Sequence, residues 1–179
     1  NGCTAEAETL VTIYPSPVVT LVAPGTSCVN TTFMVNASTV GGTGPYVYQW
    51  TQNTDVLPFS GATITANPTS SGLIEYSVTV TDSNGCDGSA SGTVTIAPDP
   101  TVTLNTPAPI CEGRTSTITA SVSGGSGSYT YQWFQSGSLV GTGQTLTVTA
   151  STTSTYTVNV TDSNGCDGSA NGTVTIAPD

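Results

Sequence analysis

Residues 154–179, STYTVNVTDSNGCDGSANGTVTIAPD, decide the fold class of this chain. Tyr156, Val158 and Val160 alternate with polar residues, which is the period of a β-strand with one buried face. The Asp-Ser-Asn-Gly run that follows is a strong turn signal, and the alternation resumes at Val174. The stretch therefore predicts an antiparallel hairpin.

This hairpin belongs to a tandem repeat. Residues 80–99 recur at 160–179 with a single difference, Ser91 in place of Asn171. Repetition at this spacing predicts two domains of about 80 residues rather than one large domain.

The repeat also predicts how the chain is divided. The segment LVTIYPSP at 10–17 corresponds to TVTIAPDP at 93–100, so the chain is expected to open inside a repeat. We predict that residues 1–15 are the last strand of a preceding repeat, residues 16–98 are repeat 1, and residues 99–179 are repeat 2.

Aromatic residues mark the expected core of each repeat. They share one face of a predicted strand and are Tyr46, Tyr48 and Trp50 in repeat 1 and Tyr129, Tyr131 and Trp133 in repeat 2. Together with the apolar runs at 18–22, 32–37 and 61–66, they give about six or seven short antiparallel strands per repeat. The expected fold class is all-β, with each repeat an antiparallel β-sandwich.

Three segments resemble the Ig-like and PKD-like tandem repeats of large bacterial cell-surface adhesins: ICEGRTSTITA (110–120), YTYQW (129–133) and STYTVNVTDSNGC (154–166). The resemblance covers both repeats, although repeat 1 has SCVN where repeat 2 has ICEG. It implies tandem immunoglobulin-like sandwiches that act as spacers or adhesive modules and carry no catalytic residues.

Charge and composition exclude several function classes. One basic residue, Arg114, stands against eleven acidic residues, so the net charge of -10 disfavours binding to nucleic acid or anionic lipid. Lys and His are absent, which removes the usual general bases at neutral pH. We therefore expect no enzymatic activity.

The five cysteines indicate disulfides and an oxidising compartment. The sequence has no CxxC pair and no His, so zinc is a poor alternative. We expect an extracellular or cell-surface location. Because no apolar run of about 18 residues is present, we expect no membrane insertion.

Disulfide pairing is open at the level of sequence. Counting suggests Cys28 with Cys86 and Cys111 with Cys166, one bridge in each repeat. In a sandwich, however, these partners would lie at opposite ends of a strand, roughly 25 Å apart, whereas a bridge needs Cα atoms within about 7 Å. The geometry favours Cys28 with Cys166 across successive repeats. Cys3, at the position of Cys86 in the preceding repeat, would pair outside these units.

Oxygen-bearing residues around the Gly turns are candidate calcium ligands, because hard cations prefer carboxylate and amide oxygens. The candidates are Asp82, Asn84, Asp87, Asp99, Asp162, Asn164 and Asp167. The topology predicts that the second turn approaches the linker carboxylate of Asp99. The alternative is a β-turn stabilised by the Asp side chain, without any metal.

Four sequons are candidate glycosylation sites, at Asn30, Asn36, Asn159 and Asn171. In a chain so rich in Ser and Thr, chance matches are common, so an unmodified chain is the alternative.

These observations predict an extracellular structural protein whose tandem repeats form a rigid stalk or filament at a bacterial surface, stiffened by calcium and glycosylated. The expected partners are other copies or repeats of itself, arranged head to tail. The alternative is an adhesin module that binds a glycan or a host protein, for which Phe59 and Phe134 are the aromatic candidates.

Overall fold

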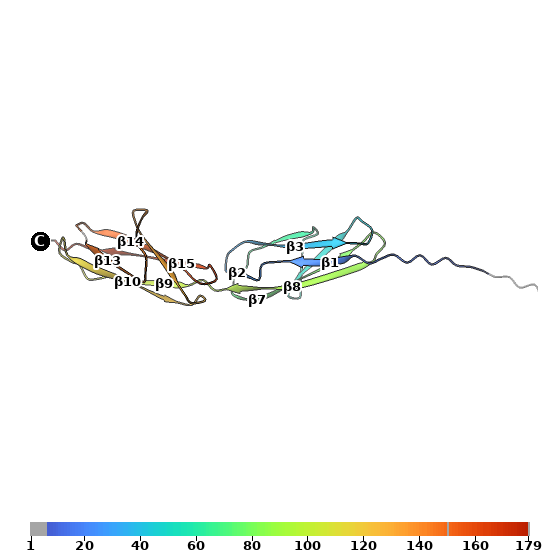
Figure 1. Cartoon of the computed structure of the whole chain (residues 1–179), viewed down its shortest axis with the longest axis horizontal. Helices are drawn as coiled ribbons and strands as arrows, with labels where there is room; N and C mark the ends of the chain where they lie inside the picture. Colours follow the sequence, from blue (N-terminus) through green and yellow to red (C-terminus); the bar gives the residue numbers. More distant parts are fainter. Residues whose placement is uncertain (1–6, 150, 179) are drawn as a thin grey trace, which may run out of the picture. The chain divides into compact units, whose positions relative to one another are not determined.

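The computed structural model describes residues 7–149 and 151–178, and this part of the chain forms fifteen β-strands and no helix (Figure 1). Cys3 lies outside the described residues. Accordingly, the described residues contain no helix that could cross a lipid bilayer. The fold class is all-β, as the alternation predicted.

Two sheets form the first sandwich. One has the order β1-β3-β6, with β1 (Val18–Val22), β3 (Phe33–Val40) and β6 (Thr63–Ala66). The other has the order β2-β8-β7-β4-β5, with β2 (Thr26–Cys28), β8 (Asp87–Ala97), β7 (Gly72–Thr81), β4 (Val47–Gln52) and β5 (Asp55–Leu57). The short strand β2 runs parallel to β8, whereas the register of β4 with both β5 and β7 is antiparallel.

The second sandwich repeats this arrangement. Its sheets have the orders β13-β10-β9 and β12-β11-β14-β15. The strands are β9 (Thr101–Asn105), β10 (Thr115–Ser123), β11 (Thr130–Gln135), β12 (Ser138–Gly141), β13 (Thr145–Thr149), β14 (Ser154–Thr161) and β15 (Asp167–Val174). A single parallel bridge between Ile110 and Ile176 takes the place of the β2–β8 pairing. The predicted hairpin is the β14–β15 pair.

One tryptophan anchors each core. Trp50 and Trp133 are fully buried, and their indole N–H groups donate to the carbonyl oxygens of Gly61 and Gly143 at 2.8 Å. In the β11–β14 register Trp133 lies opposite Val158, which is also fully buried. The tryptophan therefore fills the sandwich while its one polar atom remains paired.

The neighbouring tyrosines are less buried than the alternation predicted. Tyr46, Tyr48, Tyr129 and Tyr131 share the inner face with the tryptophans but are only partly buried. The hydroxyl groups of Tyr46 and Tyr129 donate to the carbonyl oxygens of Gly41 and Gly124. These rings lie toward the end of the strand, where their hydroxyl groups reach a loop.

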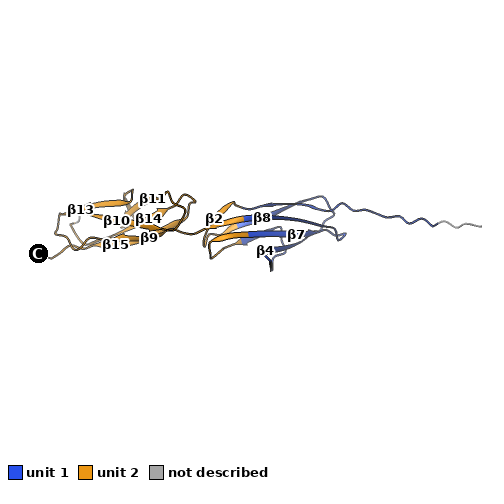
Figure 2. Ribbon diagram, turned by 90° about the horizontal axis from the view of Figure 1, so that it is seen from below, with its two compact units in different colours: residues 1–23, 34–65, 75–93 blue, residues 24–33, 66–74, 94–179 orange. Residues whose placement is uncertain are grey.

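The chain divides into two compact units (Figure 2). The first comprises residues 34–65, 75–93 and the described part of 1–23. The second comprises residues 24–33, 66–74 and the described part of 94–179. Strand β8 contributes to both units. The second unit therefore includes the Cys28 segment of repeat 1 together with repeat 2.

Residues 7–17, which include part of the predicted strand at 1–15, form no strand. Leu10 and Ile13 are 91% and 88% exposed, whereas Ile96, the repeat counterpart of Ile13, is buried in β8. No other residue in the described part of the chain packs over these side chains.

Candidate functional site

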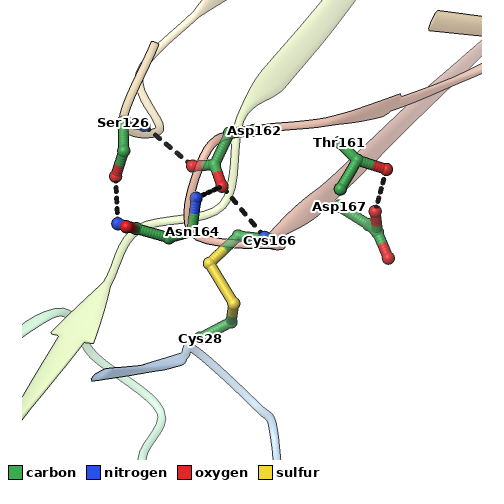
Figure 3. Close-up of a disulfide and its surroundings, with 7 residues drawn as sticks. All are labelled: Cys28, Ser126, Thr161, Asp162, Asn164, Cys166 and Asp167. Carbon is green, nitrogen blue, oxygen red and sulfur yellow. Dashed lines mark hydrogen bonds between the residues drawn. A yellow bond between two sulfur atoms is a disulfide. The ribbon is translucent and has the colours of Figure 1, made fainter. Parts of the chain in front are cut away.

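A disulfide joins Cys28 to Cys166, whose Cα atoms are 5.5 Å apart although the residues are separated by 138 positions in sequence. Cys28 is the last residue of β2, where it lies opposite Ala97 of β8. Cys166 is buried at the end of the turn before β15 (Figure 3). This is the cross-repeat pairing that strand geometry favoured.

The pairing suggested by counting does not form. Cys86 and Cys111, its other two members, are free thiols, Cys111 exposed and Cys86 partly buried. A bridge within each repeat would have to span the length of the sandwich, which two cysteine side chains cannot do.

Asp162 fixes the turn that presents Cys166. Its Oδ1 accepts the backbone N–H groups of Asn164 and Cys166, each at 2.9 Å, and its Oδ2 accepts the N–H of Ser126 at 2.8 Å. The side chain is 6% exposed. One carboxylate thus joins the β14–β15 turn to the loop between β10 and β11 (Figure 3).

Repeat 1 builds the same clamp around Asp82. Its Oδ1 accepts the N–H groups of Asn84 and Cys86, and its Oδ2 accepts the N–H of Thr43, all at 2.9 Å. The Asn84 amide also donates to the Thr43 hydroxyl. The turn geometry is therefore a property of the repeated sequence.

Hydrogen bonding sets the ionisation of both carboxylates. Desolvation by burial raises the pKa of Asp82 and Asp162, but backbone N–H donors, led by those of Cys86 and Cys166, outweigh it and lower both values below the ordinary one. The charged form is thus favoured without any basic side chain or metal.

The loop partner of the carboxylate is a feature that the sequence analysis missed. Gly-Gly-Thr-Gly at 41–44 recurs as Gly-Gly-Ser-Gly at 124–127, at the same offset as the aromatic strand. A Cβ at Gly125 would lie 2.9 Å from Asp162 Oδ2, and the φ of this residue is +68°. The repeated glycines were the signal, since they let the loop approach the carboxylate.

The predicted calcium ligands have hydrogen-bond partners within the protein, and calcium binding stays a prediction. Asp87 and Asp167 are exposed and accept hydrogen bonds from Thr81 and Thr161 at 2.6 Å. Asp167 turns toward Thr161 rather than toward Asp162 (Figure 3). The Asx-turn alternative accounts for the positions of Asp82, Asn84, Asp162 and Asn164.

Asp99 lies beside the disulfide instead. Among residues 7–149 and 151–178, the one group of three potential metal-binding acidic or sulfur side chains comprises Cys28, Asp99 and Cys166, with ligand atoms within 4.8 Å of one another. Two of these atoms are the bonded sulfurs, so the group offers a single carboxylate and no thiolate.

All four sequon asparagines, Asn30, Asn36, Asn159 and Asn171, are exposed. Asn36 accepts a hydrogen bond from Thr63, and Asn30 lies in a turn with a φ of 57°. Their exposure is compatible with modification, which stays a prediction.

Residues 98–178 match the family described as "Ig-like domain CHU_C associated". These residues therefore resemble that Ig-like family. Repeat 1 has the same strand orders apart from the additional strand β2, so the described residues form two sandwiches with the Ig-like fold. The comparison found no catalytic family, and a search among curated proteins found no match.

Several solved structures are similar to this chain, and the first of them supports the Ig-like fold. The insect immune protein hemolin matches with a TM-score of 0.51 at 16% identity, over 90% of this chain and 47% of hemolin. The fibronectin(III)-like modules of Clostridium thermocellum CbhA give 0.46 at 15% identity, over 89% of this chain and 94% of theirs. A 1.5-MDa bacterial ice-binding adhesin gives 0.40 at 18% identity, over 91% of this chain and 66% of the solved chain.

Proposed function

We propose that this chain is a segment of an extracellular structural protein, a stalk or filament of tandem Ig-like repeats at a bacterial surface, and that it performs no catalysis. The observation that carries the proposal is the Cys28–Cys166 disulfide, which covalently ties one repeat to the next. A bridge of this kind holds successive repeats together, and it requires an oxidising compartment.

The near-identity of the two hairpins supports a structural role. Asp82 and Asp162 make the same three hydrogen bonds to backbone N–H groups, and the turns differ in none of their residues from 82 to 88 and from 162 to 168. A binding loop that recognises a partner would differ between repeats. Repeated geometry instead suits head-to-tail contact between like units.

Electron microscopy of the native material tests this proposal. Cells labelled with an antibody against the 179-residue chain should carry the label along extended stalks or fibres. Label confined to compact particles would contradict a structural role and favour the adhesin module.

The adhesin alternative rests on the exposed aromatic side chain of Phe59, which is 43% exposed, and on a shallow polar depression over β11, β14 and β15 that includes Gln132 and Asn159. Binding of the chain to a glycan array, lost in Phe59→Ala and retained in Phe134→Ala, would support it.

We also propose, from the sequence, that the chain binds calcium and is glycosylated. Backbone N–H groups already donate to the oxygens of Asp82 and Asp162. Among the candidate calcium ligands, the other carboxylates are Asp87, Asp99 and Asp167. If calcium stiffens the chain, EGTA should lower its melting temperature and added calcium should restore it. An unchanged melting temperature would remove calcium from the proposal. Mass spectrometry of the native protein tests the sequons.

A further inference from the structure

The two free cysteines occupy the repeat positions of the two bonded cysteines. Cys111 follows Ile110, which bridges Ile176 in parallel, just as Cys28 follows Ser27, which pairs with Ile96 in parallel. Cys111 therefore stands in the second sandwich where Cys28 stands in the first.

Cys86 is the corresponding counterpart of Cys166. The backbone N–H of each donates to the turn carboxylate at 2.9 Å, and the carbonyl oxygen of each accepts the N–H of Asp82 or Asp162, also at 2.9 Å. The turn holds both cysteines in the same conformation. Cys86 therefore has the backbone setting of Cys166, and Cys111 has the backbone setting of Cys28.

Cys86 lies beside the segment that precedes β1. Its Sγ lies 4.0 Å from the carbonyl oxygen of Tyr14. Tyr14 is the repeat counterpart of Ala97, and Ala97 is the register partner of Cys28. The counterpart of the residue opposite Cys28 therefore lies beside Cys86, while no counterpart of Cys28 itself accompanies it in the described part of the chain.

We propose that Cys111 of one copy of this chain forms a disulfide with Cys86 of a second copy, so that the bridge seen between Cys28 and Cys166 recurs between chains. This inference rests on the proposed structural function and names the covalent chemistry of its junctions. Ala177 of the first copy would take the place of Tyr14 in the second. Since residues 7–14 form no strand, moving them aside breaks no ladder.

The bond forms by thiol–disulfide exchange with a small-molecule disulfide such as oxidised glutathione as the oxidant. One cysteine thiolate attacks the glutathione disulfide and releases one glutathione thiolate. The second cysteine thiolate then attacks the mixed disulfide and releases the other. Two protein thiols are oxidised, one glutathione disulfide is reduced, and the two thiol protons end on two glutathione molecules.

Two complementary variants of the full chain test the pairing, both carrying Cys3→Ser so that the first cysteine cannot compete. Cys86→Ser leaves Cys111 as the free thiol, and Cys111→Ser leaves Cys86. Each is incubated alone, and the two are mixed, in a glutathione redox buffer. The products are separated on a non-reducing gel, and peptic peptides of the dimer are identified by mass spectrometry.

The mixture should give about tenfold more dimer than either variant alone, because a preformed fit raises the local thiol concentration. The dimer should contain a Cys86–Cys111 peptide. The Cys3→Ser parent, with both thiols, should give a ladder of longer oligomers that collapses on reduction.

Equal dimer yields alone and in the mixture would show unselective oxidation and overturn the proposal. So would a mixture that stays monomeric with titratable thiols while each variant retains its Cys28–Cys166 peptide. Neither result would contradict the proposed structural function, since microscopy of the native material does not depend on Cys86 or Cys111.

Discussion

Asp162 shows how one side chain can replace a basic residue or a metal ion in this lysine-free protein. Its carboxylate is nearly buried, yet its charge is stabilised by backbone N–H donors from two loops. Charge-assisted hydrogen bonds of this kind are stronger than neutral ones. The turn that carries Cys166 thereby has a fixed conformation before the disulfide forms.

The stability of the protein should consequently depend on the ionisation of Asp162. A depressed native pKa contributes stability above the unfolded pKa of about 3.9, and this contribution is lost as the pH falls through the lower native value. Asp162→Asn should reduce the free energy of unfolding at pH 7, and the difference from wild type should shrink below about pH 4. Urea unfolding at pH 7 and pH 3 measures it.

Asp167→Asn is the matched control, because Asp167 is exposed and has a hydrogen bond from Thr161. It should change the free energy of unfolding little at either pH. A difference between Asp162→Asn and wild type that is the same at both pH values would refute this account of the turn.

At the scale of the element, the last strand of each repeat depends on a glycine that touches another backbone. A Cβ on Gly168 would lie 2.1 Å from the carbonyl oxygen of Pro100, and one on Gly88 would lie 2.0 Å from that of Pro17. Backbone atoms cannot turn aside as a flexible side chain can. The glycine is therefore part of the packing between β15 and the start of β9.

Gly168→Ala should destabilise the protein by about 1–3 kcal/mol or more, because the strand must shift away from Pro100. Gly25→Ala is the control, since nothing lies within 4 Å of a Cβ there and its φ is not in the positive range. Thermal unfolding of both variants gives the comparison. Equal melting temperatures would mean that the strand moves aside without cost.

The elements that sequence predicted best are those with strict alternation and duplicated turns. The β14–β15 hairpin follows directly from the spacing of Tyr156 and Val158, because a one-residue slip would expose the buried face. Burial of the tyrosines was overestimated, since alternation identifies a face but not how far along the strand the core extends. The contact of Asp162 with the loop at 124–127 depends on tertiary packing, which no local pattern contains.

The calcium prediction illustrates the same limit. Oxygen-bearing residues at alternate positions around a Gly turn occur both in loops that bind a cation and in Asx turns that bind none. At Asp162 one of the N–H donors comes from Ser126, 36 residues away, which the local sequence does not reveal. Whether a cation also binds there stays a prediction.

For the whole molecule, the disulfide determines how far the chain can be stretched. When both ends are pulled, tension passes from Cys28 to Cys166 through the sulfur atoms, and the chain segment between these two residues carries none. Single-molecule stretching of Cys28→Ser should therefore release about 480 Å more contour length than the oxidised wild type, at about 3.5 Å per residue. Cys111→Ser, which keeps the bridge, should match the wild type. Equal extensions for wild type and Cys28→Ser would show that the bridge does not carry the tension.

The same bridge gives the chain a tolerance to scission. Arg114, its one basic residue, is exposed in the turn after Cys111 and lies inside the loop that Cys28 and Cys166 close. A protease that cuts after Arg114 opens this loop but separates no fragment, because the two pieces remain joined through sulfur. A surface protein exposed to foreign proteases would thus keep its two ends connected after a first cut, and only a second break or a reductant would detach them.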